Sequence, residues 1–360
     1  MVHSRRVIRL VFSVGLTAIL AGCGAGASNA PAPSAGASNA PAASAGASNA
    51  PAASGGVVTG PKVSIKLVDD FTPADPLNTF LQKFADEVNQ KAGGSITVTL
   101  FNGSQLGSET DIDRQLSNGA VQMSMVGVTG YAPLDAFFTP FAVQSEAQLA
   151  AILQQNLLKP YFDTFEAKQN SHFIGSLYVT PREMTSNRAI KTLADLQGLV
   201  LRVPSNQAEV TVFKALGAQP TILAFTEVYT ALQNGTAQAQ ENPVSTIKSA
   251  KFYEVQKYLN MTNHGIQPEY VFISSATWAS MSPDQQAVIT TSFADIKAQQ
   301  EVASKAAFDQ DVADLQSHGM TLVQSDTAAL RDKVYQSTVR PLLVGLWGEE
   351  IVAQIEKLPS

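Results

Sequence analysis

The amino-acid sequence predicts an α/β fold built as two lobes with a cleft between them. Strand and helix patterns alternate as β-α-β-α-β over residues 63–178. The alternation restarts near residue 180, and one very long helical pattern follows at 283–318. Because the chain returns from the second α/β unit to the first, we expect the two units to be joined by more than one crossing of the chain.

The first unit begins with a strand, since Val63, Ile65 and Leu67 alternate with polar residues. Residues 75–91 then carry apolar side chains at helical spacing, and the glycines at 93–94 stop that helix. The remaining elements predicted for this unit are strands at 95–101, 121–126 and 172–178, and helices at 109–118 and 145–168. Their short connections favour a parallel sheet covered by helices.

The second unit has a strand at 199–203 that Pro204 ends, followed by a helix at 206–217 with Asn206 as its N-cap. Gln240-Glu241-Asn242-Pro243 comes later, and we expect Asn242 to cap a helix whose first turn holds Pro243. The other elements predicted here are a strand at 219–223, helices at 226–234 and 243–251, and a strand at 270–274 that returns to the first unit.

The N-terminal residues predict export. Three arginines precede an apolar stretch at 10–21 that is too short to span a bilayer, so residues 1–22 are predicted to be a signal peptide. Cys23 is the only cysteine in the chain, and it follows Leu-Ala-Gly. This tetrapeptide resembles the lipobox of bacterial lipoproteins. We expect Cys23 to be lipidated; ordinary cleavage that leaves a free thiol is the alternative.

Residues 23–61 predict a linker. They contain three copies of a decapeptide such as AGASNAPAPS, and no charged residue lies between Cys23 and Pro61. Such a segment buries too little apolar surface to offset its ordering entropy. The linker would reach about 35 Å as a flexible chain. A tether that holds a folded domain at a membrane is one interpretation, and repeat expansion without a selected length is the other.

The composition excludes several functions. One cysteine rules out an intramolecular disulfide framework, and 24 basic against 30 acidic residues argue against nucleic acid as a partner. Removal of the signal peptide would leave 21 basic and 30 acidic residues. The histidines at 172, 264 and 318 lack metal-ligand spacing. No nucleophile-elbow or phosphate-loop motif is present, so we expect no cofactor, no metal and no enzymatic activity.

Arg202 is the residue that most needs an explanation, because it lies in the apolar strand Leu-Val-Leu-Arg-Val-Pro. A buried guanidinium requires a partner. The carboxyl end of a strand is where open α/β sheets bind ligands, and a guanidinium fits a carboxylate in a bidentate way. A ligand carboxylate and a protein carboxylate are both possible partners. Asn242 could face the same ligand group instead of only capping a helix, and Arg182 lies where the two units are linked.

The stretch from Thr185 to His264 resembles the substrate-binding proteins of TRAP transporters, in particular the branch that includes sialic-acid-binding proteins. GSQLGSE at 103–109 and FTEVYTALQ at 225–233 support the resemblance, which covers essentially all of 62–345. It implies a periplasmic-binding-protein-like fold of two sheets, with a hinge and a long helix that spans both lobes. It also implies an extracytoplasmic receptor that delivers an organic acid to integral-membrane permease subunits. The implied lobes are 62–181 with 268–308, and 182–267 with 309–360.

The resemblance also implies a set of ligand-binding residues. Arg202 matches the arginine that clamps the ligand carboxylate, and Arg182 matches a second arginine that often joins it. Asn242 matches an amide of the site, and Phe225 matches an aromatic residue that packs on the ligand. The other expected ligand-binding residues are Asp70, Glu109, Gly127 and Tyr178. Asp70 and Glu109 could contact ligand hydroxyls, or could serve only as strand-end and helix N-terminal charges.

Departures from the family pattern affect the expected ligand. Gln238-Ala239 stands where the family often has Asp-Gly, and Gly127 and Gly130 stand where the sialic-acid branch has an acidic and a basic residue. These differences disfavour sialic acid. We expect a sugar acid, either a uronate or an aldonate. The alternative ligands are a small mono- or dicarboxylate and a 2-oxo acid. The alternative functions are a receptor for an ATP-driven importer, an enzyme on this scaffold, and an adhesive lipoprotein.

Overall fold

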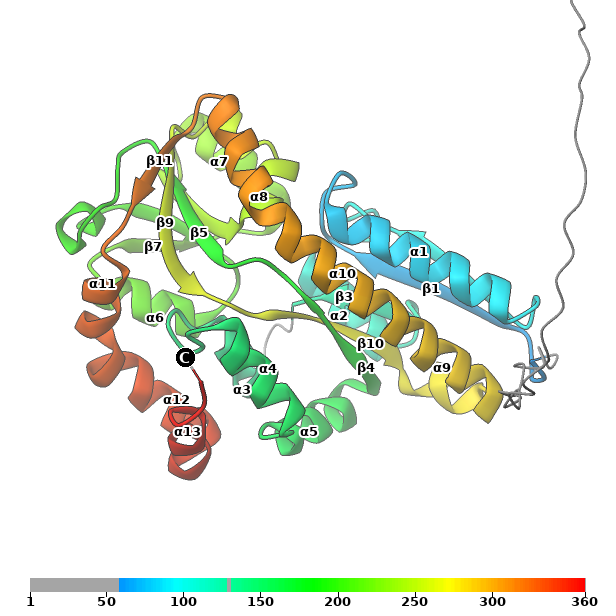
Figure 1. Cartoon of the computed structure of the whole chain (residues 1–360). Helices are drawn as coiled ribbons and strands as arrows, with labels where there is room; N and C mark the ends of the chain where they lie inside the picture. Colours follow the sequence, from blue (N-terminus) through cyan, green and yellow to red (C-terminus); the bar gives the residue numbers. More distant parts are fainter. Residues whose placement is uncertain (1–57, 128–130, 360) are drawn as a thin grey trace, which may run out of the picture. The chain divides into compact units, whose positions relative to one another are not determined.

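The computed structural model describes residues 58–127 and 131–359 (Figure 1). The predicted signal peptide, Cys23 and nearly all of the predicted linker lie outside the described residues, as does Gly130. Within the part of the chain that is described, no helix is long and apolar enough to cross a membrane.

The first α/β unit forms a five-stranded sheet, sheet A, with the order β2-β1-β3-β10-β4. Its strands are β1 (Val63–Asp69), β2 (Ile96–Phe101), β3 (Met123–Val126), β4 (Ser171–Tyr178) and β10 (Pro268–Ser274). β1 is parallel to β2 and β3, as predicted. β10 pairs antiparallel with both β3 and β4, so sheet A is mixed where a parallel sheet was expected. The strand that returns from the second unit causes this difference.

The second unit forms a six-stranded sheet, sheet B, with the order β11-β9-β5-β8-β6-β7. Its strands are β5 (Arg182–Ser186), β6 (Val200–Val203), β7 (Gln219–Ile222), β8 (Ala239–Pro243), β9 (Tyr258–Gly265) and β11 (Thr321–Gln324). The sequence reasoning missed β5, β8, β9 and β11. The prediction that Asn242 caps a helix is wrong, because Asn242 and Pro243 belong to β8 and the next helix begins at Val244.

The helices cover the sheets, and six of the thirteen α-helices in the described residues each correspond to one helix that the sequence predicted. They are α1 (Pro76–Lys91), α2 (Glu109–Ser117), α3 (Ala132–Asp135), α4 (Glu146–Gln154), α5 (Lys159–Gln169), α6 (Gln207–Ala215), α7 (Val228–Asn234), α8 (Val244–Ser249), α9 (Ser275–Ser280), α10 (Pro283–Ser317), α11 (Thr327–Val334), α12 (Arg340–Trp347) and α13 (Glu349–Ile355). Asn206 caps α6, as predicted, by accepting hydrogen bonds from the backbone N–H groups of Ala208 and Glu209. The single helix predicted at 145–168 is two helices, α4 and α5, because Asn156 adopts a left-handed conformation with φ of 52°.

The long helix α10 contacts elements of both sheets. It packs along α1 and β4 of the first unit and reaches α8 of the second, as Figure 1 shows for the orange helix. Phe293 and Ile296 are buried in the core of sheet A, whereas Leu315 is buried under α7 and α8. The predicted helix that spans both lobes is therefore present.

Two short strand connections join the sheets beside α10. Residues 179–181 link β4 to β5, and residues 266–267 link β9 to β10. Gln300 of α10 is buried and holds the first connection, because its Oε1 accepts a hydrogen bond from Tyr178 N and its Nε2 donates one to Tyr178 O. These segments are the expected place of a hinge, and the exact lobe boundaries stay a prediction.

Candidate functional site

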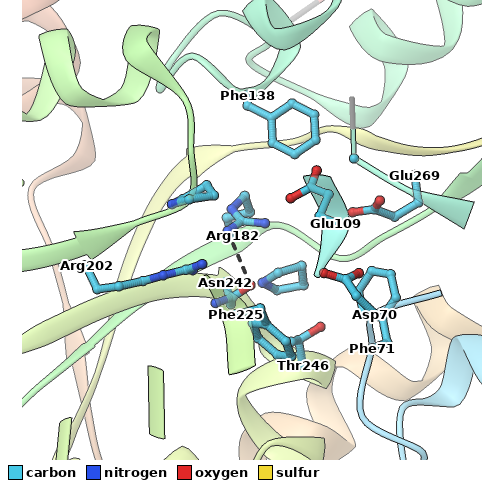
Figure 2. A pocket seen from close by; sticks show the side chains of 13 residues that line it. Asp70, Phe71, Glu109, Phe138, Arg182, Arg202, Phe225, Asn242, Thr246 and Glu269 are labelled. Carbon is cyan, nitrogen blue, oxygen red and sulfur yellow. Dashed lines mark hydrogen bonds between the residues drawn. The ribbon is translucent and has the colours of Figure 1, made fainter. Parts of the chain in front are cut away.

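A charged cavity lies between the two sheets, and the unfilled space in it and in the open solvent at its mouth is about 490 Å³. Side chains from both sheets line it (Figure 2). Seven of the eight predicted ligand-binding residues are among them: Asp70, Glu109, Gly127, Arg182, Arg202, Phe225 and Asn242. The lining residues that the sequence reasoning missed are Phe71, Phe138, Pro204, Pro243, Thr246 and Glu269.

Arg202 reaches this cavity from β6, and its side chain extends toward the centre in Figure 2. Its Nε and Nη2 donate hydrogen bonds to the carbonyl oxygen of Leu223 at 3.0 and 2.8 Å. Burial lowers its pKa, but the group stays a cation at neutral pH. Arg202 forms no ion pair with a carboxylate of the described residues, and its Nη1 has no hydrogen-bond partner among them. One edge of the guanidinium is therefore fixed, and the other is available to a ligand.

Arg182 comes from β5 and is held by a different kind of partner. Its Nε donates to Oε2 of Glu241 at 2.5 Å, and its Nη2 donates to Oε1 of the same carboxylate at 2.8 Å. Burial by itself would raise the pKa of Glu241, but Arg182 and His264 outweigh burial and lower that pKa to about 2. Arg182 is thus one half of a buried ion pair, and it also lines the cavity.

Asn242 orients Arg182 at the cavity wall. Its Oδ1 accepts a hydrogen bond from Nη2 of Arg182 at 3.3 Å, which is the dashed line in Figure 2. One N–H of its Nδ2 donates to Oε1 of Gln240 at 2.6 Å, and the other has no hydrogen-bond partner among the described residues. Gln240 in turn donates to Oγ1 of Thr185 on the neighbouring strand β5. This chain of bonds explains why a strand as polar as β8 can be buried.

The arginine side of the cavity carries a net positive charge. Burial lowers the pKa of His264 and so favours its neutral form. Burial, followed by the nearby charge of Glu241, raises the pKa of Glu209 well above its ordinary value and favours the neutral form of this carboxyl group. Two guanidinium groups therefore face one ionised carboxylate, and an anion in the cavity would be stabilised.

The opposite side of the cavity is acidic. Asp70 follows the last residue of β1, Glu109 is the first residue of α2, and Glu269 lies in β10. Figure 2 shows their carboxyl groups across the cavity from Arg202. Burial raises the pKa of Asp70 to about 6 and that of Glu269 to about 8, and it also raises the pKa of Glu109. Glutamate beside a proline, at the start of an apolar strand, was the sequence signal that could have identified Glu269.

Gly127 makes room for Glu109. A Cβ atom at position 127 would lie 2.4 Å from Oε1 of Glu109 and 3.1 Å from the ring of Phe138. Real Cβ atoms essentially never show a contact as short as 2.4 Å, so the Glu109 carboxyl group would have to move. Only glycine therefore lets the Glu109 carboxyl group lie against this part of the backbone.

Tyr178 does not join the other predicted residues. Its hydroxyl donates a hydrogen bond to Glu146, and Nζ of Lys305 lies 5.2 Å from the centre of its ring. It lines a separate hollow beside α10, together with Lys297. Within the described residues, no group of three or more His, Cys, Asp or Glu side chains could hold a metal ion.

Known proteins are similar to this chain in both sequence and fold. The profile of the bacterial extracellular solute-binding proteins, family 7, matches residues 68–340. Solute-binding protein RD1_1052 of Roseobacter denitrificans is 34% identical over 281 residues, which is 77% of this chain and 85% of the relative. The sialic acid-binding periplasmic protein SiaP of Vibrio cholerae is 34% identical over 57% of this chain and 65% of that protein.

Solved structures give the same result. The crystal structure of RD1_1052 with bound L-galactonate has a TM-score of 0.74 and 30% identity, and covers 84% of this chain and 100% of its own. The sugar acid binding protein DctPAm of Advenella mimigardefordensis, in complex with galactonate, has a TM-score of 0.77 and 28% identity. The match covers 83% of this chain and 99% of the DctPAm chain.

The fold and the cavity therefore define a two-lobed solute-binding protein. The chain belongs to the bacterial extracellular solute-binding proteins, family 7, which are the solute-binding proteins of TRAP transporters. Members of this class bind small organic acids and work with a membrane permease.

Proposed function

We propose that this protein is the extracytoplasmic receptor of a TRAP-type transporter, and that it captures a sugar acid by an arginine clamp and delivers it to the permease. One observation carries the proposal: Arg182 and Arg202 line the same cavity, and each is held by the protein through only part of its guanidinium group. The Nη1 groups remain for a carboxylate of the ligand.

The two fixed edges matter because they pre-organise the clamp. Arg202 is held by the carbonyl of Leu223, and Arg182 by Glu241 and Asn242. Little side-chain entropy is then lost when the ligand binds. The net positive charge of this side supplies the electrostatic attraction.

The acidic side supports a hydroxylated ligand. Asp70, Glu109 and Glu269 offer carboxyl oxygens that accept hydrogen bonds from hydroxyl groups. Phe225 lines the same cavity with an apolar ring, which would pack against the carbon chain. Galactonate in the structures of RD1_1052 and DctPAm is an acid of this kind. We therefore favour an aldonate or uronate over a plain carboxylate or a 2-oxo acid.

Capture would proceed by closure of the two predicted lobes, 62–181 with 268–308 and 182–267 with 309–360. The connections at 179–181 and 266–267 are short, so they can act as hinges between rigid sheets. The ligand must bind the closed form better than the open form for closure to signal anything to the permease.

Membrane attachment remains part of the proposal. Lipidation of Cys23 would hold the receptor at the membrane, and the segment at 24–61 would act as a tether. Radioactive palmitate should label the wild-type protein in cells and should not label Cys23→Ala. Equal labelling of both proteins would contradict the anchor without affecting the binding site.

Arg202→Ala tests the clamp. Loss of one member of a buried charged pair costs about 2–5 kcal/mol, or roughly 30- to several-thousand-fold in affinity. Calorimetry of purified full-length protein with L-galactonate should show this loss, while the circular dichroism of the variant stays native. Wild-type affinity in Arg202→Ala would refute the clamp. Recovery of chemically unchanged ligand after long incubation distinguishes a receptor from an enzyme.

A further inference from the structure

Glu269 is the buried group of the cavity that an arginine clamp leaves unexplained. Glu269 is only 4% exposed, and its Oε2 has no hydrogen-bond partner among the described residues. It lines the cavity, and Figure 2 shows its carboxyl group on the acidic side with Glu109 and Asp70. A buried carboxyl oxygen without a donor is unfavourable. A ligand in the cavity could supply the hydrogen-bond partner that this carboxyl group lacks among the described residues.

The strand register places Glu269 beside Glu109. Tyr270 of β10 pairs with Val126, the last residue of β3, so Glu269 and Gly127 lie on the same side of this pair. Oε1 of Glu109 lies against the same glycine, only 2.4 Å from where a Cβ would be. Two carboxyl groups, one from α2 and one from β10, thus line the same cavity as Gly127.

A ligand that spans this cavity meets two different environments. At one end, Arg182 and Arg202 attract an anion. At the other end, burial raises the pKa of Glu269 to about 8 and raises that of Glu109 well above its ordinary value, which favours the neutral form of both groups. A neutral carboxyl group can donate as well as accept a hydrogen bond, as a hydroxyl group can. It offers an ammonium group no counter-charge, and it becomes an anion as the pH rises.

We propose that Glu109 and Glu269 form a hydroxyl subsite that selects a polyhydroxylated monoacid over the diacid of the same length. The inference rests on the proposed function, because the arginines must first fix the carboxylate end of the ligand. A second carboxylate at the other end would meet the negative charge of Asp70 at pH 7 and, as the pH rises past about 8, that of Glu269 as well. Like charges brought together in a buried site typically cost several kcal/mol. The diacid should therefore bind at least about 100-fold more weakly.

This selection should depend on pH. The other charged groups that bear on the two glutamates from neighbouring elements are Asp70, Asp75, Asp113, Asp135, Arg182 and Arg202. Because Glu269 loses its proton near pH 8, the discrimination against the diacid should increase between pH 6 and pH 9.

The experiment compares three six-carbon acids by calorimetry on purified full-length protein. L-galactonate is the monoacid, galactarate carries a second carboxylate in place of the terminal hydroxymethyl group, and hexanoate has no hydroxyl groups. Glu269→Gln removes the acidic group and keeps its size. Glu183→Gln is the matched control, because Glu183 is fully buried with its pKa raised to about 8 by burial but does not line the cavity.

The expected result is that wild-type protein and Glu183→Gln bind L-galactonate at least about 100-fold more tightly than galactarate or hexanoate. At pH 9, where Glu269 is ionised, Glu269→Gln should bind galactarate about 10-fold better, relative to galactonate, than the wild type does. Binding of galactonate within about threefold of galactarate or hexanoate in wild-type protein would overturn the subsite and would leave the arginine clamp standing. An unchanged ratio in folded Glu269→Gln would also overturn it. Failure of all three acids to bind would instead contradict the proposed function.

Discussion

Arg182→Met should destabilise the protein far more than Arg202→Met, although both arginines line the same cavity. Arg182 donates two hydrogen bonds to the Glu241 carboxylate, whose side chain is only 1% exposed. Breaking a buried pair by removing one partner costs about 3–5 kcal/mol. Arg202 holds only the carbonyl of Leu223, and loss of that donor costs about 1 kcal/mol, offset by relief from burying a guanidinium.

Urea unfolding of ligand-free protein measures this difference directly. We expect Arg182→Met to lose about 3–5 kcal/mol in the free energy of unfolding and Arg202→Met to stay within about 1 kcal/mol of wild type. Adding Glu241→Gln to Arg182→Met should restore part of the loss, because the uncompensated charge is then removed. If Arg182→Met unfolds at the wild-type urea concentration, or if both variants lose the same free energy, the division of roles between the two arginines is incorrect.

Three other predictions concern Gly127, Glu269 and Asp75. Gly127→Ala should leave the fold intact and weaken L-galactonate binding about 10-fold, because its Cβ would displace the Glu109 carboxyl group from a position 2.4 Å away; unchanged affinity in calorimetry would contradict this. Glu269 has its pKa raised to about 8 by burial, so its contribution to stability is complete below its ordinary pKa and is lost as the pH rises toward 8. Thermal melts should therefore show the ligand-free protein to be less stable at pH 8.5 than at pH 5.5, by up to about 3 kcal/mol from this carboxyl, and Glu269→Gln should show a smaller slope. Asp75 caps α1 by accepting a hydrogen bond from Leu77 N, and it also accepts hydrogen bonds from Thr246 and Ser249 of α8. Asp75→Ala should therefore lower the free energy of unfolding in urea by about 1 kcal/mol more than Asp75→Ser, because serine can still cap the helix. An equal loss in the two variants would argue against the cap.

The elements that the sequence predicted correctly depend on local interactions. The Asn206 cap of α6 is made by side-chain and backbone groups within three residues of each other. The long helix α10 follows from a repeated apolar pattern and from Ser282-Pro283 at its start. Arg202 could be singled out because a charged residue in an apolar strand is unusual wherever the strand lies.

The elements that were missed depend on distant partners. β8 reads Ala-Gln-Glu-Asn-Pro, which is typical of a turn and a helix start. It is a buried strand only because Thr185 and Arg182, on the neighbouring strand β5, pair with its side chains. The broken helix at 145–168 shows the opposite case, since Asn156 permits a left-handed turn that the apolar pattern does not reveal.

The family, the two-unit α/β plan and the two arginines near the junction of those units could be inferred from the amino-acid sequence. Periodicity and motifs record such features because they depend on neighbouring residues. The folded arrangement was needed to show which edge of each arginine is available to a ligand, and that Glu109 and Glu269 face the arginines across one cavity. The partner that fixes Arg182 is 59 residues away along the chain, and a hydrogen bond over that separation exists only after the two strands have paired.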